Sequence, residues 1–526
     1  MASGLPQVSA DRIEARIPVA FPLAGGSAAL IVAALILVPL GAVTVTAGGL
    51  RAPSPADLEA LWFTLWQAAV SAAVSCALAV PAARALNRRR FPGRAALIAL
   101  MGAPFVLPSI VAVTALLTVF GRKGLVNEAL GALGLPSVGI YGAHGVILAH
   151  VFFNLPLAVR MILHGWQAIP SERMRLAASL GFGPAEVARH LERPMLRQVL
   201  PGAFLAIFLV CLTSFAVALI LGGGPRATTL ELAIFQAFRY DADLGRAAAL
   251  ALAQVAVTLI ALGLAAAVTA PPAFGAGLDR AGERLIPTGR ARTAKDATVI
   301  ALIAAFLLVP LATVLAGGAG QIPRLPASVW QATAVSLAVA AGSTVLTVAL
   351  ALTLATAGRK WAEAAGMLPM AVSSLVFGTG LFIVLRPLAP PAVLALPVTL
   401  IANALMSLPF ALRVLLPEAK RLAEDYDRLA ASLGLRGWAR LQFLTLPRLA
   451  RPLGFAAGLA AAFSMGDLGV ITLFSDGHQQ TLPMAIYAMM GSYHQNLAAG
   501  AATVLTAITL GLFYGLDRIG RRSDDM

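Results

Sequence analysis

The segment Arg175-Leu-Ala-Ala-Ser-Leu-Gly181 occurs a second time, unchanged, as Arg428-Leu-Ala-Ala-Ser-Leu-Gly434. The two copies lie 253 positions apart, close to half of the 526 residues. At the same offset, Asn154-Leu-Pro-Leu-Ala-Val-Arg160 matches Ser407-Leu-Pro-Phe-Ala-Leu-Arg413. Collinear matches at one offset indicate an internal duplication. The chain is therefore expected to fold as two copies of one structural unit.

The amino-acid composition indicates whether these two units face water or lipid. Hydrophobic residues make up 59% of the chain and charged residues only 12%, whereas soluble proteins carry roughly 25% charged residues. This excludes a soluble globule and predicts an all-α polytopic membrane protein. The net charge of +15 is spread over short loops. Such loops set membrane topology, and no nucleic-acid partner is expected.

Twelve apolar runs are long enough for a helical crossing of about 20 residues. They lie at about 19–47, 59–86, 95–120, 141–165, 198–221, 247–270, 297–316, 328–357, 364–385, 394–415, 451–474 and 497–517. Six spans in each half is an even number, so both halves enter the membrane in the same direction. The prediction is thus two tandem six-helix parallel repeats.

Basic residues predict the orientation of these spans. With the N-terminus inside, the loops and tails on that side hold 31 Lys and Arg residues, and the opposite loops hold 8. The excess of Lys and Arg marks the cytoplasmic side, so both termini are expected in the cytoplasm. The predicted division of the chain is a tail and first helix (1–58), a first transmembrane domain (59–270), a cytoplasmic linker (271–296), a seventh helix with its outer loop (297–327), a second transmembrane domain (328–518) and a tail (519–526).

The duplicated segment falls in a predicted cytoplasmic loop of each half, and a proline follows its glycine after thirteen residues. This spacing resembles the EAA loop of ABC-importer permeases, which forms the coupling helix that docks on the nucleotide-binding subunit. Both copies depart from that motif at the first position, where arginine replaces glutamate. The positions that match or replace the motif are Arg175, Ala177, Ala178, Gly181, Leu191 and Pro194 in the first half, and Arg428, Ala430, Ala431, Gly434, Leu444 and Pro447 in the second.

The chain carries no P-loop of its own. A Walker A motif needs Gly-Lys-Ser/Thr, and none of the four lysines, Lys123, Lys295, Lys360 and Lys420, stands in that context. No cofactor is expected in this chain, and it is not expected to be an enzyme. The resemblance to ABC permeases implies a separate ATPase, and two coupling loops in one chain imply two ATPase copies.

Several loops resemble the permeases of thiamine and thiamine pyrophosphate ABC importers. The longest of them begins Gly222-Gly-Gly-Pro-Arg-Ala-Thr-Thr-Leu-Glu-Leu-Ala-Ile and is followed by Tyr240-Asp-Ala-Asp, and Gly466-Asp-Leu-Gly469 also fits. The resemblance implies a bacterial inner membrane, a periplasmic binding protein, and thiamine or its phosphate esters as substrate, moved by alternating access. A ferric-iron importer permease is the alternative, and an ion-coupled secondary transporter is a more distant one.

Asp467 is the one carboxylate placed well inside a predicted span, and its repeat mate is Ser214. Carboxylates within a membrane usually face a cavity or a partner. Two interpretations stay open for Asp467: it lines the translocation path with Ser214 and favours a cation, or it makes a hydrogen bond between helices. Glu231, in the outer loop between the fifth and sixth spans, either contacts a delivery protein or is solvated, and solvation is the expectation.

Other polar and sulfur-containing residues of the spans are expected to serve packing. His150, Asn154 and Asn403 are interpreted as hydrogen-bonding groups between helices. The two cysteines, Cys76 and Cys211, are interpreted as small buried hydrophobic residues. The sequence offers neither paired cysteines nor a metal-ligand spacing around them.

Overall fold

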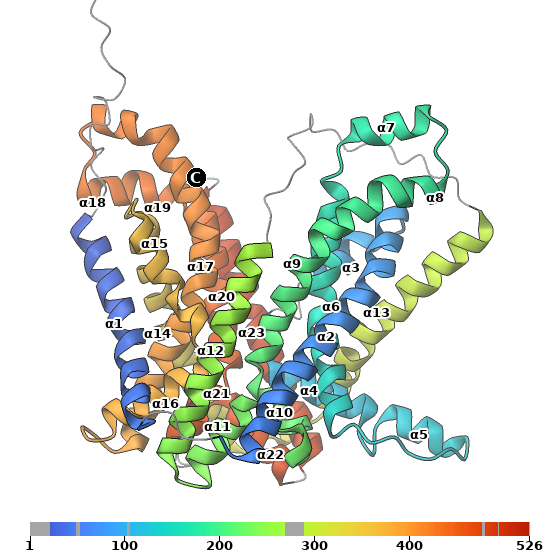
Figure 1. The fold of residues 1–526 in the computed structure, drawn as a ribbon. Helices are drawn as coiled ribbons and strands as arrows, with labels where there is room; N and C mark the ends of the chain where they lie inside the picture. Colours follow the sequence, from blue (N-terminus) through green and yellow to red (C-terminus); the bar gives the residue numbers. More distant parts are fainter. Residues whose placement is uncertain are drawn as a thin grey trace, which may run out of the picture.

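The computed structural model describes residues 22–48, 53–101, 106–268, 289–475, 479–492 and 494–524. Within these ranges the regular structure is helical throughout (Figure 1). Eleven helical stretches are long and apolar enough to cross a membrane, and a twelfth crossing is available in Lys360–Ala371 and Ser374–Leu385, bent by 95°. The predicted all-α class with about twelve spans is confirmed. The predicted N-terminal tail up to residue 21 and linker residues 271–288 lie outside the described ranges.

The helices of the first half are α1 (Pro22–Thr46), α2 (Pro55–Arg88), α3 (Arg94–Leu100), α4 (Ser109–Phe120), α5 (Leu125–Ala132), α6 (Ala143–Gln167), α7 (Ser171–Ser179), α8 (Pro184–Val187), α9 (Arg193–Leu212), α10 (Phe215–Leu221), α11 (Leu230–Arg239) and α12 (Leu244–Val268). A π-helical turn, Ala188–Glu192, joins α8 to α9.

The helices of the second half are α13 (Arg290–Ala319), α14 (Ala327–Ala355), α15 (Lys360–Met367), α16 (Ser374–Leu385), α17 (Pro391–Ser432), α18 (Gly437–Arg440), α19 (Leu446–Arg448), α20 (Ala450–Gly466), α21 (Gly469–Phe474), α22 (Leu482–Gly491) and α23 (Gln495–Asp524). A π-helical turn, Leu441–Thr445, lies between α18 and α19. α13 begins inside the segment that the sequence assigned to the linker.

The two halves repeat one succession of elements. In each, a long helix (α2, α14) is followed by an interrupted span (α3–α4, α15–α16), a long helix (α6, α17) and a loop with short helices. A second interrupted span (α9–α10, α20–α21), a short helix (α11, α22) and a last long helix (α12, α23) complete the unit. The order of elements therefore repeats along with the sequence.

One difference separates the halves at the duplicated segment. In the first half α7 is a separate helix that starts after Pro170, whereas α17 continues without a break to Ser432. The helix that contains the predicted span 394–415 thus continues beyond it to Ser432. Pro170 has an alanine, Ala423, as its repeat mate. A proline disfavours helical backbone in the residue before it, and alanine does not, so the second copy stays joined to its span.

The second interrupted span breaks at the same repeat position in both halves. Ser214 precedes α10 with φ −85° and ψ 101°, and Asp467 follows α20 with φ −71° and ψ 131°. Asp467 Oδ1 accepts a hydrogen bond from the backbone N–H of Gly469 at 3.2 Å. Short polar side chains compete with the helix for backbone groups in this way, which accounts for the start of a new helix at Gly469.

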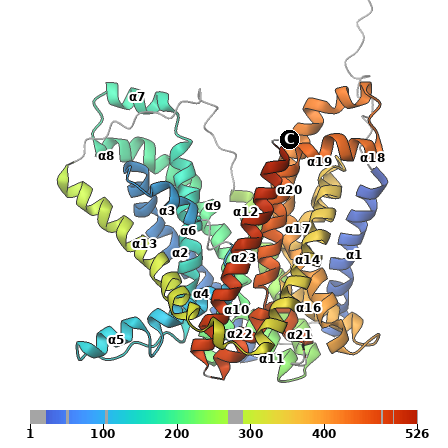
Figure 2. The same ribbon diagram turned by 180° about the vertical axis from the view of Figure 1, so that it is seen from behind.

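The first helix of each half packs against the opposite half. α1 lies along α15 and α16, and α13 lies along α2 and α4 (Figure 1 and Figure 2). The backbones of α1 and α16 approach closely, since a Cβ on Gly380 would lie 2.6 Å from the carbonyl oxygen of Pro39. α13 meets α4 through the hydroxyls of Thr118 and Thr313, 3.1 Å apart. This reciprocal exchange ties the two halves together.

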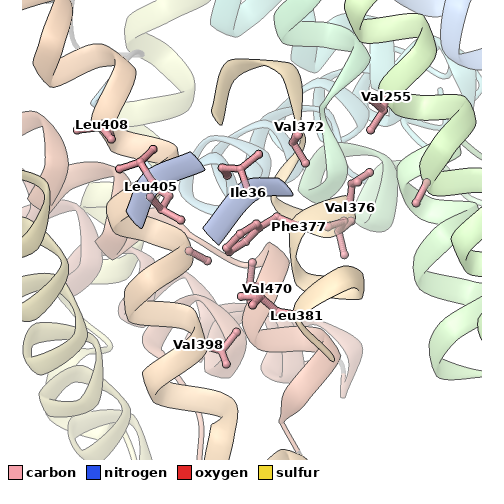
Figure 3. Packing of buried hydrophobic residues seen from close by; sticks show 14 of the residues in the cluster. Ile36, Val255, Val372, Val376, Phe377, Leu381, Val398, Leu405, Leu408 and Val470 are labelled. Carbon is pink, nitrogen blue, oxygen red and sulfur yellow. The ribbon is translucent and has the colours of Figure 1, made fainter. Parts of the chain in front are cut away.

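A hydrophobic core joins the halves at this exchange. It contains side chains from α1 and α12 of the first half and from the α16 segment, α17 and α21 of the second (Figure 3). Its labelled members are Ile36, Val255, Val372, Val376, Phe377, Leu381, Val398, Leu405, Leu408 and Val470. Close packing of such side chains, rather than exclusion of water, holds helices together in lipid.

Candidate functional site

The duplicated segments lie at one end of the molecule and on opposite sides of it (Figure 1 and Figure 2). α7 carries the first copy, and the last turns of α17 carry the second. The short helices α5, α11 and α22 lie at the opposite end (Figure 1). The arrangement presents two equivalent helical segments to one side of the spans.

Both copies end in the same backbone motif. Gly181 has φ +70° and Gly434 has φ +67°. In the first copy, the N–H of Phe182 donates to the carbonyl of Ala177 at 2.9 Å; in the second, the N–H of Leu435 donates to Ala430 at 2.9 Å. This six-to-one hydrogen bond with a left-handed residue is the Schellman motif, which favours glycine. The glycine recurs at the same place in both copies because the backbone motif that ends each helix requires a left-handed residue there.

Each copy exposes two leucines that are four residues, or about one helical turn, apart. Leu176 and Leu180 are 59% and 61% exposed, and Leu429 and Leu433 are 54% and 65% exposed. In both copies the preceding arginine and the second alanine are also exposed: Arg175, Ala178, Arg428 and Ala431. The first alanine, Ala177 or Ala430, is buried on the side facing the protein. Two leucines and one alanine therefore form an exposed apolar strip on each copy, with the arginine beside it.

The remaining positions of the motif occupy matching places after the glycine. Leu191 and Leu444 lie in the two π-helical turns and are half-buried, while Pro194 and Pro447 stand exposed in the first turn of α9 and α19. Proline is tolerated there because its missing N–H has no partner inside the helix. The structure therefore places every motif position equivalently in the two halves.

Ion pairs stabilise both loops, by a contact to α2 in the first half and by a contact within the loop in the second. Glu192, 7% exposed in its side chain, pairs with Arg84 and with Arg88 at the end of α2. In the second half, Arg440 pairs with Asp427, and both side chains are buried to a similar extent. Arg175, by contrast, contacts residues of its own helix: the exposed Glu172 at 3.5 Å and the Ser171 hydroxyl at 3.4 Å. The ion pairs therefore stabilise the loops without covering the exposed leucines.

Asp467 and Ser214 stand at equivalent helix breaks. One oxygen of Asp467 is used at the break, and the other, Oδ2, is buried with no hydrogen-bond partner. The Ser214 hydroxyl does not cap α10. The hydrogen bond of Asp467 is local, within its own break, so a bond between helices is not what the structure shows for it.

The other polar residues of the spans join neighbouring helices, as predicted. The amide of Asn154 donates to His150 O and lies 3.4 Å from Cys211 Sγ, and Asn403 donates to Ser464 Oγ at 3.0 Å. His150 Nδ1 lies 3.5 Å from Ser71 Oγ. Cys76 and Cys211 are free and buried. These residues serve packing of the spans.

The expectation for Glu231 is wrong. The sequence assigned it to a solvated outer loop, but its side chain is fully buried. Burial raises the pKa of Glu231 to about 8, and the Ser373 hydroxyl partly offsets this. The signal that was available in the sequence is the apolar run around it, Leu230 to Phe235, which folds into α11 with a buried face.

Comparison with known proteins places this arrangement in a family. The chain is 38% identical over 529 residues to the thiamine transport system permease protein ThiP of Brucella abortus, covering 97% of both chains. The chain belongs to the ThiP family. ThiP of Escherichia coli is 38% identical over 477 residues, covering 88% of this chain and 89% of its own. No family model matches the chain.

A half-length relative supports the duplication. The putative 2-aminoethylphosphonate transport system permease protein PhnV of Salmonella paratyphi A is 29% identical over 262 residues, which is 97% of its own length and 45% of this chain. A protein of about half the size of a ThiP chain thus matches about half of it. The repeat of elements shows that this chain carries two structural units of that size.

Proposed function

We propose that this chain is the transmembrane permease subunit of an ATP-driven, binding-protein-dependent importer of thiamine and its phosphate esters. The observation that carries the proposal is the near full-length similarity to ThiP chains combined with two equivalent exposed loop motifs. The similarity supports the substrate, and the two motifs support the energy source.

In this proposal the leucine faces of α7 and α17 are the docking surfaces for the ATPase. Each face is an exposed apolar strip in a loop that ion pairs stabilise, and it recurs once in each half. Two faces accept two copies of the ATPase subunit. Because Arg175 and Arg428 replace the glutamate of the EAA motif, each docking surface presents a cation rather than an acceptor at this position.

The orientation follows from the basic residues. The end of the molecule that carries the duplicated segments of α7 and α17 holds most of the loop arginines, and this supports a cytoplasmic location by the positive-inside rule. α11 and α22 then face the periplasm, where a substrate-binding protein delivers its load. ATP binding by the partner draws the two docking surfaces together, and the halves alternate access to a path between them. Asp467 and Ser214, at the breaks of the second interrupted spans, are the proposed path residues.

The test is transport by the assembled system in cells that lack their own thiamine importer. We expect ATP-dependent accumulation of labelled thiamine only when the permease, the neighbouring ATPase and the binding protein are all present. Unlabelled thiamine pyrophosphate is expected to compete. An assembled system that takes up ferric iron and no thiamine would keep the ABC architecture and overturn the substrate.

A further inference from the structure

Glu231 is a buried carboxyl group that nothing in the fold explains. It lies in the first turn of α11, which at ten residues is too short to cross a membrane. Its side chain is fully buried, and neither carboxylate oxygen has a hydrogen-bond partner. Among the ion pairs of the described residues, none includes Glu231. An unpaired buried carboxyl group destabilises a fold, so its presence points to a use other than stability.

The surroundings of Glu231 belong to the opposite half of the chain. α11 packs against α16 and α21, and the Ser373 hydroxyl is near enough to lower the pKa of Glu231. Ser373 begins α16, where its Oγ accepts a hydrogen bond from the N–H of Val376 at 3.2 Å. It lies at the 95° break between Lys360–Ala371 and Ser374–Leu385. We call this break, residues 372–374, the junction.

A second carboxyl group, that of the half-buried Asp467, approaches the same junction from the other side. A Cβ on Gly469 would lie 2.7 Å from Ser374 Oγ and 3.5 Å from Asp467 Oδ1, so Asp467 and Ser374 flank one glycine. Asp467 Oδ2 is buried without a partner. Glu231 thus reaches the junction from the first half of the chain and Asp467 from the second. Two adjacent serines lie at the break where both arrive.

Aromatic rings line the helices that meet here. Phe235, one turn after Glu231 on α11, lies 5.4 Å from the ring of Phe215. Phe382 of α16 lies 4.5 Å from Phe238 and 5.4 Å from Phe474 of α21. We call these five residues the aromatic cluster. Ring faces attract cations, and flat rings stack on one another.

We infer that Glu231 and Asp467, with the aromatic cluster beside them, form a binding site for a flat organic cation at the junction. Glu231, and Asp467 through its Oδ2, have carboxylate oxygens without a hydrogen-bond partner. A bound cation favours the ionised form of a carboxyl group, so they supply the counter-charge to the bound ligand, and the rings supply the stacking surface. Glu231 is fully buried and Asp467 is half-buried in this structure, so a ligand reaches Glu231 only when α11 and the bent span move apart. The inference rests on the proposed function and deepens it, because thiamine carries a positively charged thiazolium ring.

The test uses the full complex of permease, ATPase and binding protein in proteoliposomes. Two substrates are measured: labelled thiamine, and a labelled neutral analogue in which carbon replaces the thiazolium nitrogen. The variants are Glu231→Gln and Asp467→Asn, which remove charge and keep shape. Glu59→Gln, an exposed glutamate near the start of α2, is the matched control. ATP hydrolysis is measured in the same vesicles.

We expect Glu231→Gln to lower thiamine uptake per ATP hydrolysed by about tenfold, the size of one charge-assisted contact. In the same variant, the ratio of thiamine uptake to uptake of the neutral analogue is expected to fall by a similar factor. The binding protein's own preference is common to all variants, so this change reports on the permease. Glu59→Gln is expected to behave as the unmodified complex.

Unchanged uptake and unchanged preference in the assembled Glu231→Gln complex overturn the inference. So does a parallel loss of uptake of both substrates, since a structural role predicts that result. If the Glu231→Gln complex does not assemble, the Asp467→Asn complex provides the test. Its thiamine uptake and its preference for thiamine over the neutral analogue are then judged in the same way. Failure of the proposed function gives a different result, because the unmodified complex would then transport no thiamine.

Discussion

Gly181 and Gly434 hold the same backbone conformation, φ +70° and +67°, although 253 residues separate them. Neither glycine has any atom within 4 Å of the position that a Cβ would take. The requirement for glycine is therefore conformational and not one of space. This distinction makes the role of the two glycines testable with two side chains of similar size.

Asparagine and valine at both glycines are expected to behave differently. Asparagine tolerates the left-handed conformation, whereas a β-branched residue costs roughly 1–2 kcal/mol there. Gly181→Asn with Gly434→Asn is expected to retain most thiamine uptake. Gly181→Val with Gly434→Val is expected to lose several-fold, measured as initial uptake rate at equal complex in the membrane. Equal damage by both pairs would show that bulk at the surface is what matters.

The exposed leucines are expected to carry the affinity for the ATPase. Burying one leucine contributes about 1.5–3 kcal/mol, so Leu180→Asp with Leu433→Asp is expected to weaken ATPase binding by well over tenfold. The measurement is binding of purified ATPase to the solubilised permease. Leu133→Asp is the control, since Leu133 is 74% exposed and follows α5 at the opposite end of the molecule. Loss of binding in the control, or retention in the double variant, contradicts the docking surface.

The two kinds of loop ion pair are expected to differ in their effect on stability. Glu192→Gln leaves Arg84 and Arg88 without their buried partner. Removing one member of a buried pair costs about 3–5 kcal/mol, reduced here because Arg84 is one-third exposed. Glu172→Gln breaks only the exposed pair with Arg175, worth about 0–1 kcal/mol. Thermal unfolding in detergent should show a clear drop in Tm for Glu192→Gln alone.

The buried Glu231 predicts a pH dependence of stability. Its pKa is about 8 in the fold against an ordinary value of 4.5, and each unit corresponds to about 1.4 kcal/mol. The folded chain binds this proton more tightly, so its stabilising effect is complete below pH 4.5 and is lost as the pH rises to about 8. The Tm of the unmodified chain should therefore fall relative to the Tm of Glu231→Gln as the pH rises from 5 to 8. A constant difference across this range would contradict the burial.

The sequence predicted the features that recur or persist along the chain. Apolar runs of span length gave the all-α membrane class, and the copies ending at Gly181 and Gly434 gave the two equivalent loops. Both signals are local, since each depends on neighbouring residues of one stretch. The same local reading placed Leu191, Leu444, Pro194 and Pro447 in matching positions.

Features that depend on contacts between distant stretches were not predictable in this way. The exchange of α1 and α13 between halves depends on close packing such as that of Gly380 against Pro39. The burial of Glu231 depends on α16 of the other half, so the sequence expectation of a solvated side chain was wrong. The continuity of α17 followed from a single substitution, Ala423 in place of Pro170, which the comparison of the copies did not weigh.

The most direct test of the account measures uptake and ATP hydrolysis together in proteoliposomes with the complete system. We expect the unmodified complex to accumulate labelled thiamine only while ATP is hydrolysed. We also expect Gly181→Val with Gly434→Val to lower the uptake rate several-fold and to lower the stimulated rate of ATP hydrolysis with it. Accumulation of thiamine without ATP, or full coupled transport by the double valine variant, would contradict the claim that the two loops transmit the energy of the ATPase.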